Sequence, residues 1–315
     1  MCLCQGSLGV KIVALGVKTH QLRHWLGVVT NHAVVDAASA SHFFQTWSAF
    51  CRDGDAAAVE PPCHDRTLLR ARSPPVVHPD ALRTFCPRPA LSPHPPAAIA
   101  SEVFAIAGEQ VAALKRLCGG GGGGGATSTF CAVSALVWQC ACAARRLPPG
   151  SQARLIFPAN VRRRVRPPLP DRYFGNAVVQ LHAAGAAREV VGEALAATAG
   201  RIRGAIGRAD DELVRSAVDY YATTATQSSS PRMSRLAETE LEIVSWLGAR
   251  LDDVDFGWGT PRVMSRAESV RGGFVYLMDG GGPAGEGAGA VRVLVCMEAD
   301  NIKEFQRLLY ARVAC

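Results

Sequence analysis

Residues 31–36, Asn-His-Ala-Val-Val-Asp, and residues 255–259, Asp-Phe-Gly-Trp-Gly, are the two stretches that decide the fold of this 315-residue chain. An apolar run at 26–30 leads straight into the first stretch, and apolar residues at helical spacing follow it. His32 is therefore predicted to lie between a strand and a helix, where rigid elements hold a side chain that still reaches a cleft. The apolar face of that helix is predicted to pack on the strand, through Ala40, Phe43, Phe44, Trp47 and Phe50.

Two interpretations fit His32 and Asp36. A histidine can accept a proton from a hydroxyl or an amine at neutral pH while that atom attacks a carbonyl, and Asp36 would then orient the ring, hold the local backbone or pair with an arginine. Alternatively, His32 is a turn residue and Asp36 is the N-cap of the following helix.

The composition is that of a globular protein, with 48% hydrophobic and 19% charged residues. A net charge of +7 favours anionic ligands. The basic run at 162–166 could bind nucleic acid, but aromatic residues make up only 7% and do not alternate with it, so stacking of bases is poorly provided for. We predict no nucleic-acid partner and expect the run to be a solvated loop or, in part, the partner of Asp36.

The eleven cysteines include no Cys-x-x-Cys pair, so we predict no metal site and no disulfide framework. The first residues lack a basic segment followed by a long apolar core, which argues against a secretory signal, and the predicted location is the cytoplasm. Residues 126–144 are apolar but interrupted by Thr, Ser and Gln, so a buried helix is favoured over a membrane span.

The chain is predicted to comprise a first part at 1–51, a proline-rich crossover at 52–98 without a core of its own, and a second domain at 99–315. The glycine runs at 119–125 and 280–289 are predicted to be loops. Further strands are predicted at 103–107, 154–157, 241–247, 274–278 and 291–297, and helices at 109–118, 130–144, 188–206, 211–222 and 301–313. This interleaving predicts an α/β or α+β mixed class.

Four places in the chain resemble the BAHD family of plant acyltransferases, which move an acyl group from coenzyme A to an alcohol or an amine. They are the His-x-x-x-Asp motif at 32–36, the Asp-Phe-Gly-Trp-Gly motif at 255–259, the helix start at 127–130, and the run at 167–176 that contains Tyr-Phe-Gly-Asn. The last is similar to the branch that acylates anthocyanins, flavonoids and phenolic glucosides.

The resemblance implies a two-domain, chloramphenicol acetyltransferase-like fold with acyl-CoA as co-substrate and no permanently bound cofactor. It implies that His32 is the general base of a direct transfer, and no Gly-x-Ser-x-Gly nucleophile is present. Asp36 would form an ion pair with Arg162 or Arg164. Structural support beside the channel would come from the second motif, namely Asp255, Gly257, Trp258 and Gly259, with Trp258 near the oxyanion.

The chain departs from the family pattern at Asn31, Ala37 and Asn160, and it lacks the stretch of about a hundred residues, a domain's worth, that precedes the His motif in the family. The first domain is therefore predicted to be incomplete. The expected reaction is transfer of a malonyl group, or else a hydroxycinnamoyl group, to a hydroxyl of a phenolic or flavonoid glycoside by a monomer without a membrane partner. The alternative is a catalytically inactive paralogue that serves as a binding module.

Overall fold

The computed structural model describes residues 11–17, 23–85, 97–119, 127–224, 236–261, 264, 271–280 and 288–313. The chain forms two compact units. Unit 1 comprises Met1–Asp65, Pro170–Ala177 and Ala249–Glu268, and unit 2 comprises Arg66–Leu169, Val178–Gly248 and Ser269–Cys315. These units divide the chain differently from the predicted parts 1–51, 52–98 and 99–315, because two later loops belong to unit 1 and most of the crossover belongs to unit 2.

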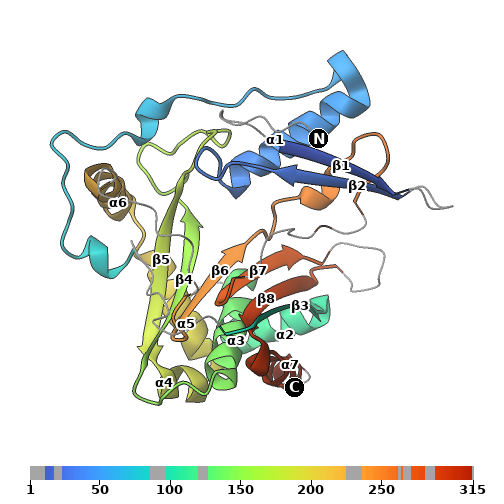
Figure 1. Ribbon diagram of the computed structural model, residues 1–315. Helices are drawn as coiled ribbons and strands as arrows, with labels where there is room; N and C mark the ends of the chain where they lie inside the picture. Colours follow the sequence, from blue (N-terminus) through green and yellow to red (C-terminus); the bar gives the residue numbers. More distant parts are fainter. Residues whose placement is uncertain are drawn as a thin grey trace. The chain divides into compact units, whose positions relative to one another are not determined.

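Unit 2 is built on a six-stranded mixed sheet in the order β3-β8-β7-β6-β4-β5 (Figure 1). The strands are β3 (Ile99–Ile106), β4 (Gln152–Asn160), β5 (Val178–Ala186), β6 (Glu240–Ser245), β7 (Phe274–Asp279) and β8 (Val291–Glu298). The pairs β4–β6 and β6–β7 are parallel, and the others are antiparallel. Ile99 of β3 pairs with Glu298 of β8, so the edge of the sheet joins segments far apart in the sequence.

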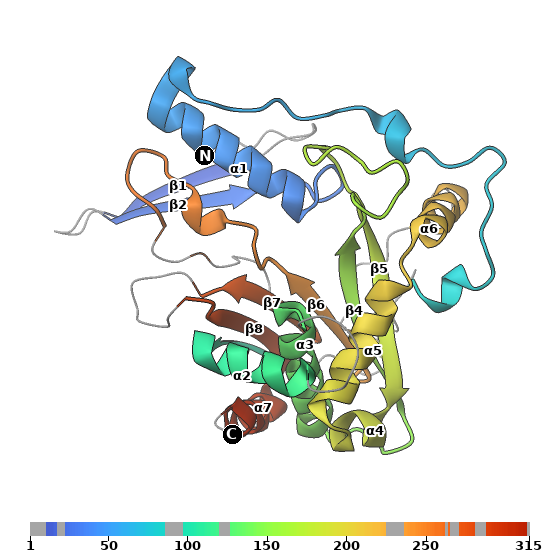
Figure 2. The same ribbon diagram turned by 180° about the vertical axis from the view of Figure 1, so that it is seen from behind.

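Helices cover one face of this sheet, behind it in Figure 1 and in front of it in Figure 2. They are α2 (Gly108–Gly119), α3 (Thr129–Ala144), α4 (Ala187–Gly192), α5 (Leu195–Gly207) and α7 (Ala299–Val313), while α6 (Asp211–Thr224) stands beside β5. Thirteen of the sixteen residues of α3 are buried, which explains why its sequence is apolar all round. The predicted buried helix is thus present. Within the described residues no helix is long and apolar enough to cross a membrane.

The helix predicted at 188–206 is two helices. Glu193 and Ala194 are extended, and the Glu193 carboxylate accepts hydrogen bonds from Thr198 Oγ1 at 2.7 Å and Arg201 Nε at 3.0 Å. This carboxylate anchors the first turns of α5, so the chain turns at Gly192 instead of continuing. The prediction also missed β5, whose Ala- and Gly-rich second half has low strand propensity.

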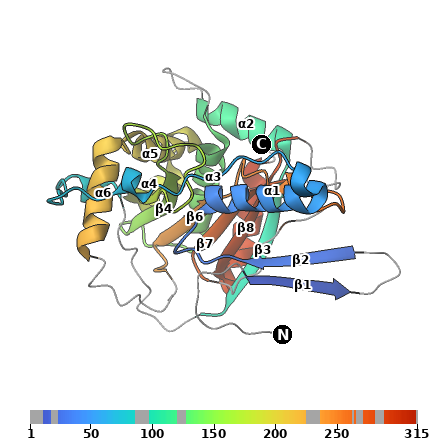
Figure 3. The same cartoon turned by 90° about the horizontal axis from the view of Figure 1, so that it is seen from above.

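Unit 1 contains a two-stranded antiparallel hairpin, β1 (Lys11–Val17) and β2 (Arg23–Val29), followed by α1 (Ala37–Asp53). Figure 3 shows the hairpin and α1 running in roughly the same direction. The predicted apolar face is wrong at Phe50, whereas Phe43, Phe44 and Trp47 on the same side of α1 are half-buried. The buried residues of α1 are Ser39, Ser41 and Ser48, whereas Phe50 is 46% exposed. The hydroxyls of Ser39 and Ser41 donate to loop carbonyls, which satisfies these buried polar side chains.

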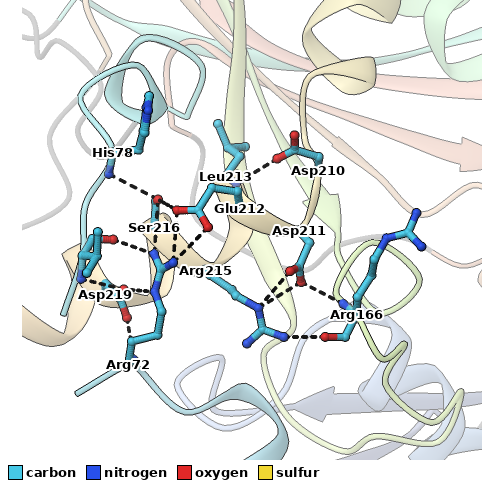
Figure 4. A network of polar contacts seen from close by, with 11 residues as sticks. Arg72, His78, Arg166, Asp210, Asp211, Glu212, Leu213, Arg215, Ser216 and Asp219 are labelled. Atoms are coloured by element: carbon cyan, nitrogen blue, oxygen red, sulfur yellow. Dashed lines mark hydrogen bonds and ion pairs between the residues drawn. The ribbon is translucent and has the colours of Figure 1, made fainter. Parts of the chain in front are cut away.

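The crossover segment is anchored to α6 by a polar network (Figure 4). Arg72 donates to Asp219 Oδ2 at 2.6 Å and to Glu212 at 2.9 Å, and the Val76 amide donates to the same Asp219 carboxylate at 2.9 Å. Further along, Phe85 is fully buried and bridges to Leu181 of β5. Residues 66–85 thus belong to unit 2 and bury Phe85 against it, which agrees with the expectation that this segment has no core of its own. Residues 86–96 and most of both glycine runs lie outside the described residues.

We expect Asp219→Asn to lower the free energy of unfolding by roughly 2 kcal/mol, because it uncouples a buried carboxylate from Arg72 and two backbone amides. Burial would raise the pKa of Asp219, but hydrogen bonds from Val76 and Arg72 lower it overall. The stabilisation should therefore be present above the ordinary aspartate pKa and be lost as the pH falls through the lowered value. Urea unfolding at several pH values tests this. Glu212→Gln, at a half-exposed carboxylate, is the control, and equal losses in both variants would contradict the prediction.

Candidate active site

His32 lies in a tight turn between β2 and α1, as the sequence predicts. The Val34 amide donates to the Asn31 carbonyl at 3.1 Å, and the Ala33 amide donates to Asn31 Oδ1 at 3.0 Å. The asparagine side chain thus closes the turn from within. His32 itself is exposed in the described structure, so its ring is not enclosed by apolar side chains.

Asp36 is the buried N-cap of α1, with 3% of its surface exposed. Its Oδ1 accepts from the Ser39 amide at 2.9 Å, and its Oδ2 accepts from the Ala177 amide at 3.0 Å. The first contact satisfies an amide that the helix leaves open, and the second joins α1 to a segment 141 residues later. The N-cap interpretation is therefore correct, and the carboxylate has a structural task as well.

Residues 173–177 are held against the start of α1 and the preceding turn by three further hydrogen bonds. The Ser39 hydroxyl donates to the Gly175 carbonyl at 3.1 Å and accepts from the Gly175 amide at 3.0 Å. Asn176 Nδ2 donates to the His32 carbonyl at 2.7 Å. The Tyr-Phe-Gly-Asn motif thus fixes the backbone of the turn that carries the histidine. Sequence analysis quoted this motif but assigned no role to Ser39 or Asn176, because a single small polar residue gives no periodic signal.

The two arginines predicted to pair with Asp36 lie in unit 2. Arg162 is 4% exposed, and its backbone amide and Nη1 both donate to Asn160 Oδ1, at 3.0 and 3.3 Å. Arg164 Nη1 donates to the carbonyls of Ile206 and Ala209 at 2.9 Å each, at the end of α5. Both arginines therefore bond to groups of unit 2, and Arg162 is buried rather than solvated. An ion pair with Asp36 remains a prediction.

The Asp-Phe-Gly-Trp-Gly motif forms a tight loop in unit 1. Asp255 Oδ1 accepts from the amides of Gly257 and Gly259 at 2.8 and 2.9 Å, and both glycines have positive φ, at 93° and 91°. Phe256 packs edge-on against Trp47 of α1 with ring centroids 4.6 Å apart, whereas Trp258 is 63% exposed. This geometry supports the predicted structural role of the motif.

A surface pocket of about 920 Å³ lies in unit 2 between α2, the start of α3 and residues 288–289. Lys115 and Arg116 line it, together with Thr127 and Thr129 at the N-terminus of α3. Thr127 is 4% exposed, and its Oγ1 makes no hydrogen bond with the described residues. Two cations beside a helix N-terminus give this pocket a positive potential that favours anions. The helix start predicted at 127–130 is part of this pocket, whereas no pattern in the sequence pointed to the two cations before the glycine run.

Comparison with known proteins identifies the family. The model of the Transferase family matches residues 24–311, so the chain belongs to this family, which comprises the BAHD acyltransferases that its motifs resemble. Putrescine hydroxycinnamoyltransferase 1 of Oryza sativa subsp. japonica is 38% identical over 306 residues, which cover 92% of this chain and 67% of that protein. A hydroxycinnamoyltransferase of Narcissus pseudonarcissus is 33% identical, with coverages of 90% and 66%. Shikimate O-hydroxycinnamoyltransferase of Nicotiana tabacum is 30% identical, with coverages of 96% and 71%. The chain thus spans about two-thirds of the length of these relatives.

Solved structures confirm the predicted fold. TRI101 of F. sporotrichioides, complexed with coenzyme A and T-2, superimposes with a TM-score of 0.71 at 18% identity, covering 89% of this chain and 64% of that one. Vinorine synthase gives a TM-score of 0.62 at 22% identity, with coverages of 89% and 60%. The mixed α/β architecture is therefore that of CoA-dependent acyltransferases. The family's co-substrate is a CoA thioester, as predicted.

We expect Gly257→Ala to lower the free energy of unfolding by about 1–2 kcal/mol, because a side chain is strained at a φ of 93°. Gly207→Ala at the end of α5 is the matched control, since a Cβ there meets nothing within 4 Å and φ is not positive. Chemical denaturation of both variants checks the difference. A loss at position 207 as large as at 257 would contradict it.

Proposed function

We propose that this protein transfers an acyl group from a CoA thioester to a small amine or hydroxyl acceptor, with His32 as the general base. The observation that carries the proposal is the anchored turn of unit 1, in which an exposed histidine projects from a backbone held at Asn31, Asp36 and Asn176. Membership of the family supports the same role. A general base must be held within reach of the proton that it removes, and such a base contributes roughly 10²–10⁴-fold in rate.

In this mechanism His32 takes the proton of the acceptor nitrogen or oxygen while that atom attacks the thioester carbonyl. The resulting tetrahedral oxyanion collapses, the carbon–sulfur bond breaks, and the imidazolium returns its proton to the departing thiolate. No covalent acyl-enzyme is required. Burial raises the pKa of the Cys140 and Cys142 thiols to about 12, which argues against either as a nucleophile.

The pocket of unit 2 is proposed to bind the phosphate groups of coenzyme A. Lys115 and Arg116 supply positive charge, and the N-terminus of α3 adds the partial charge of its free amides. Thr127 Oγ1 offers a further donor to a phosphate oxygen. These groups recognise the part of the co-substrate that does not react, so they should govern affinity rather than the chemical step.

We favour a hydroxycinnamoyl donor over the malonyl donor expected from the Tyr-Phe-Gly-Asn motif. The relatives described above are named for hydroxycinnamoyl transfer, and one of them acts on putrescine. Others act on 5-hydroxyanthranilate nitrogen or, with a benzoyl group, on tryptamine. An aliphatic or aromatic amine is therefore the first acceptor class to test, ahead of shikimate and the phenolic glycosides.

The purified chain should release the thiol of p-coumaroyl-CoA in the presence of putrescine, followed with a chromogenic disulfide reagent, and should form the amide seen by mass spectrometry. We expect His32→Ala to reduce the rate at least about 10²-fold. His78→Ala, at an exposed histidine of unit 2, is the control and should retain full activity. Absence of turnover with amine, shikimate and glycoside acceptors alike would favour the binding-module alternative, and full activity of His32→Ala would exclude the histidine as base.

The double variant Lys115→Gln/Arg116→Gln should raise the KM for acyl-CoA about tenfold and leave kcat nearly unchanged, because it removes uniform binding of the phosphates. Steady-state kinetics at low and high salt measures this, and the difference from the wild type should shrink as salt screens the charges. Lys303→Gln on the exposed side of α7 is the control. A KM equal to that of the wild type would place the coenzyme elsewhere.

A further inference from the structure

A polar stripe on α1 follows the 172–177 segment along its length. Asp36, Ser39 and His42 are three residues apart, so they lie on one side of the helix and its cap. Asp36 contacts residue 177, Ser39 contacts residue 175, and His42 contacts Arg172. The segment therefore runs antiparallel to the start of α1. The Asp36 and Ser39 contacts involve the His-x-x-x-Asp and Tyr-Phe-Gly-Asn motifs, whereas Arg172 immediately precedes the Tyr-Phe-Gly-Asn motif and His42 follows the His-x-x-x-Asp motif.

Arg172 ties the outer end of this segment at three points. Its Nη1 donates to His42 Nδ1 at 3.1 Å, its Nε donates to the Glu60 carboxylate, and its carbonyl accepts from the Cys63 amide at 2.8 Å. The Phe174 amide then donates to the Cys63 carbonyl at 2.9 Å. Arg172 therefore joins α1, residues 60–63 and the 172–177 segment within unit 1.

The protonation state of His42 allows it to accept the hydrogen bond from Arg172. Burial and the neighbouring Arg172 charge lower the pKa of His42, against smaller opposing effects of the Glu60 carbonyl and carboxylate. The ring is therefore neutral at pH 7, and its Nδ1 can accept from the guanidinium. A neutral, half-buried acceptor fixes the direction of the arginine side chain, which an exposed carboxylate alone does not.

We propose that Arg172 is a positioning residue for His32, acting through the 172–177 segment and the Asn176 contact with the His32 carbonyl. The inference rests on the proposed function insofar as His32 is the base. Arg172 and Glu60 are 36% and 70% exposed, and exposed ion pairs of this kind contribute little to stability. Their loss should therefore change where His32 stands more than whether unit 1 folds, and small displacements of a catalytic group have large effects on rate.

The test compares Arg172→Met with Arg307→Met, which removes a similarly exposed pair with Glu304 on α7. In full-length protein carrying ¹³C-labelled histidine, the His32 signal is assigned by its absence in His32→Ala. We expect Arg172→Met to shift or broaden the His32 signal and Arg307→Met to leave it unchanged. We also expect kcat to fall about tenfold with the KM for acyl-CoA within twofold, and Arg172→Lys to recover part of the rate.

Glu60→Gln guards against a folding defect, because it alters one exposed partner and should move the His32 signal in the same direction by a smaller amount. The proposal is overturned if the His32 signal and kcat are the same in Arg172→Met as in Arg307→Met, or if kcat falls only in proportion to lost folded protein. If the wild type has no acyltransferase activity, the proposed function fails, while the histidine spectra still decide whether Arg172 positions His32.

Discussion

The buried Asp36 carboxylate is the constraint on which the candidate active site depends. Removing a carboxylate from water costs free energy, and the chain offsets this cost with two backbone amides and the positive end of α1. One oxygen begins the helix and the other fixes residue 177, so a single group sets both the axis of α1 and the path of a distant loop. His32 lies in the turn that precedes Asp36, so the anchoring of Asp36 also restrains the backbone that carries the histidine.

Two serines of α1 add to this anchoring. The loops that carry both family motifs pass over Ser39 and Ser41, whose hydroxyls bond their backbones. Backbone groups of buried loops need such partners, since water cannot reach them. On the aromatic side of α1, Trp47 packs against Phe256 and so helps to hold the Asp-Phe-Gly-Trp-Gly loop.

The sequence predicted the elements whose pattern is strong and local. The apolar run of α3 and the apolar strands β7 and β8 lie where expected, and His32 and Asp36 lie at the predicted junction. Prediction failed where tertiary contacts override local pattern. β5 is a strand because β4 pairs along its whole length, and the helix break at Glu193 reflects a carboxylate that bonds to side chains of the following helix. Arg172, Ser39 and Asn176 act through contacts with residues more than a hundred positions away, which no spacing in the sequence reveals.

The pairing of β3 with β8 has a consequence for how the molecule is made. During synthesis β3 emerges long before β8, because the two strands lie far apart in the sequence: Ile99 of β3 pairs with Glu298 of β8. Until β8 emerges, the apolar residues of β3, Phe104 and Ile106 among them, lack the strand that completes their layer. Contacts of such high sequence separation close slowly and leave unpaired strands exposed to self-association. The nascent chain should therefore be prone to self-association until β8 has left the ribosome.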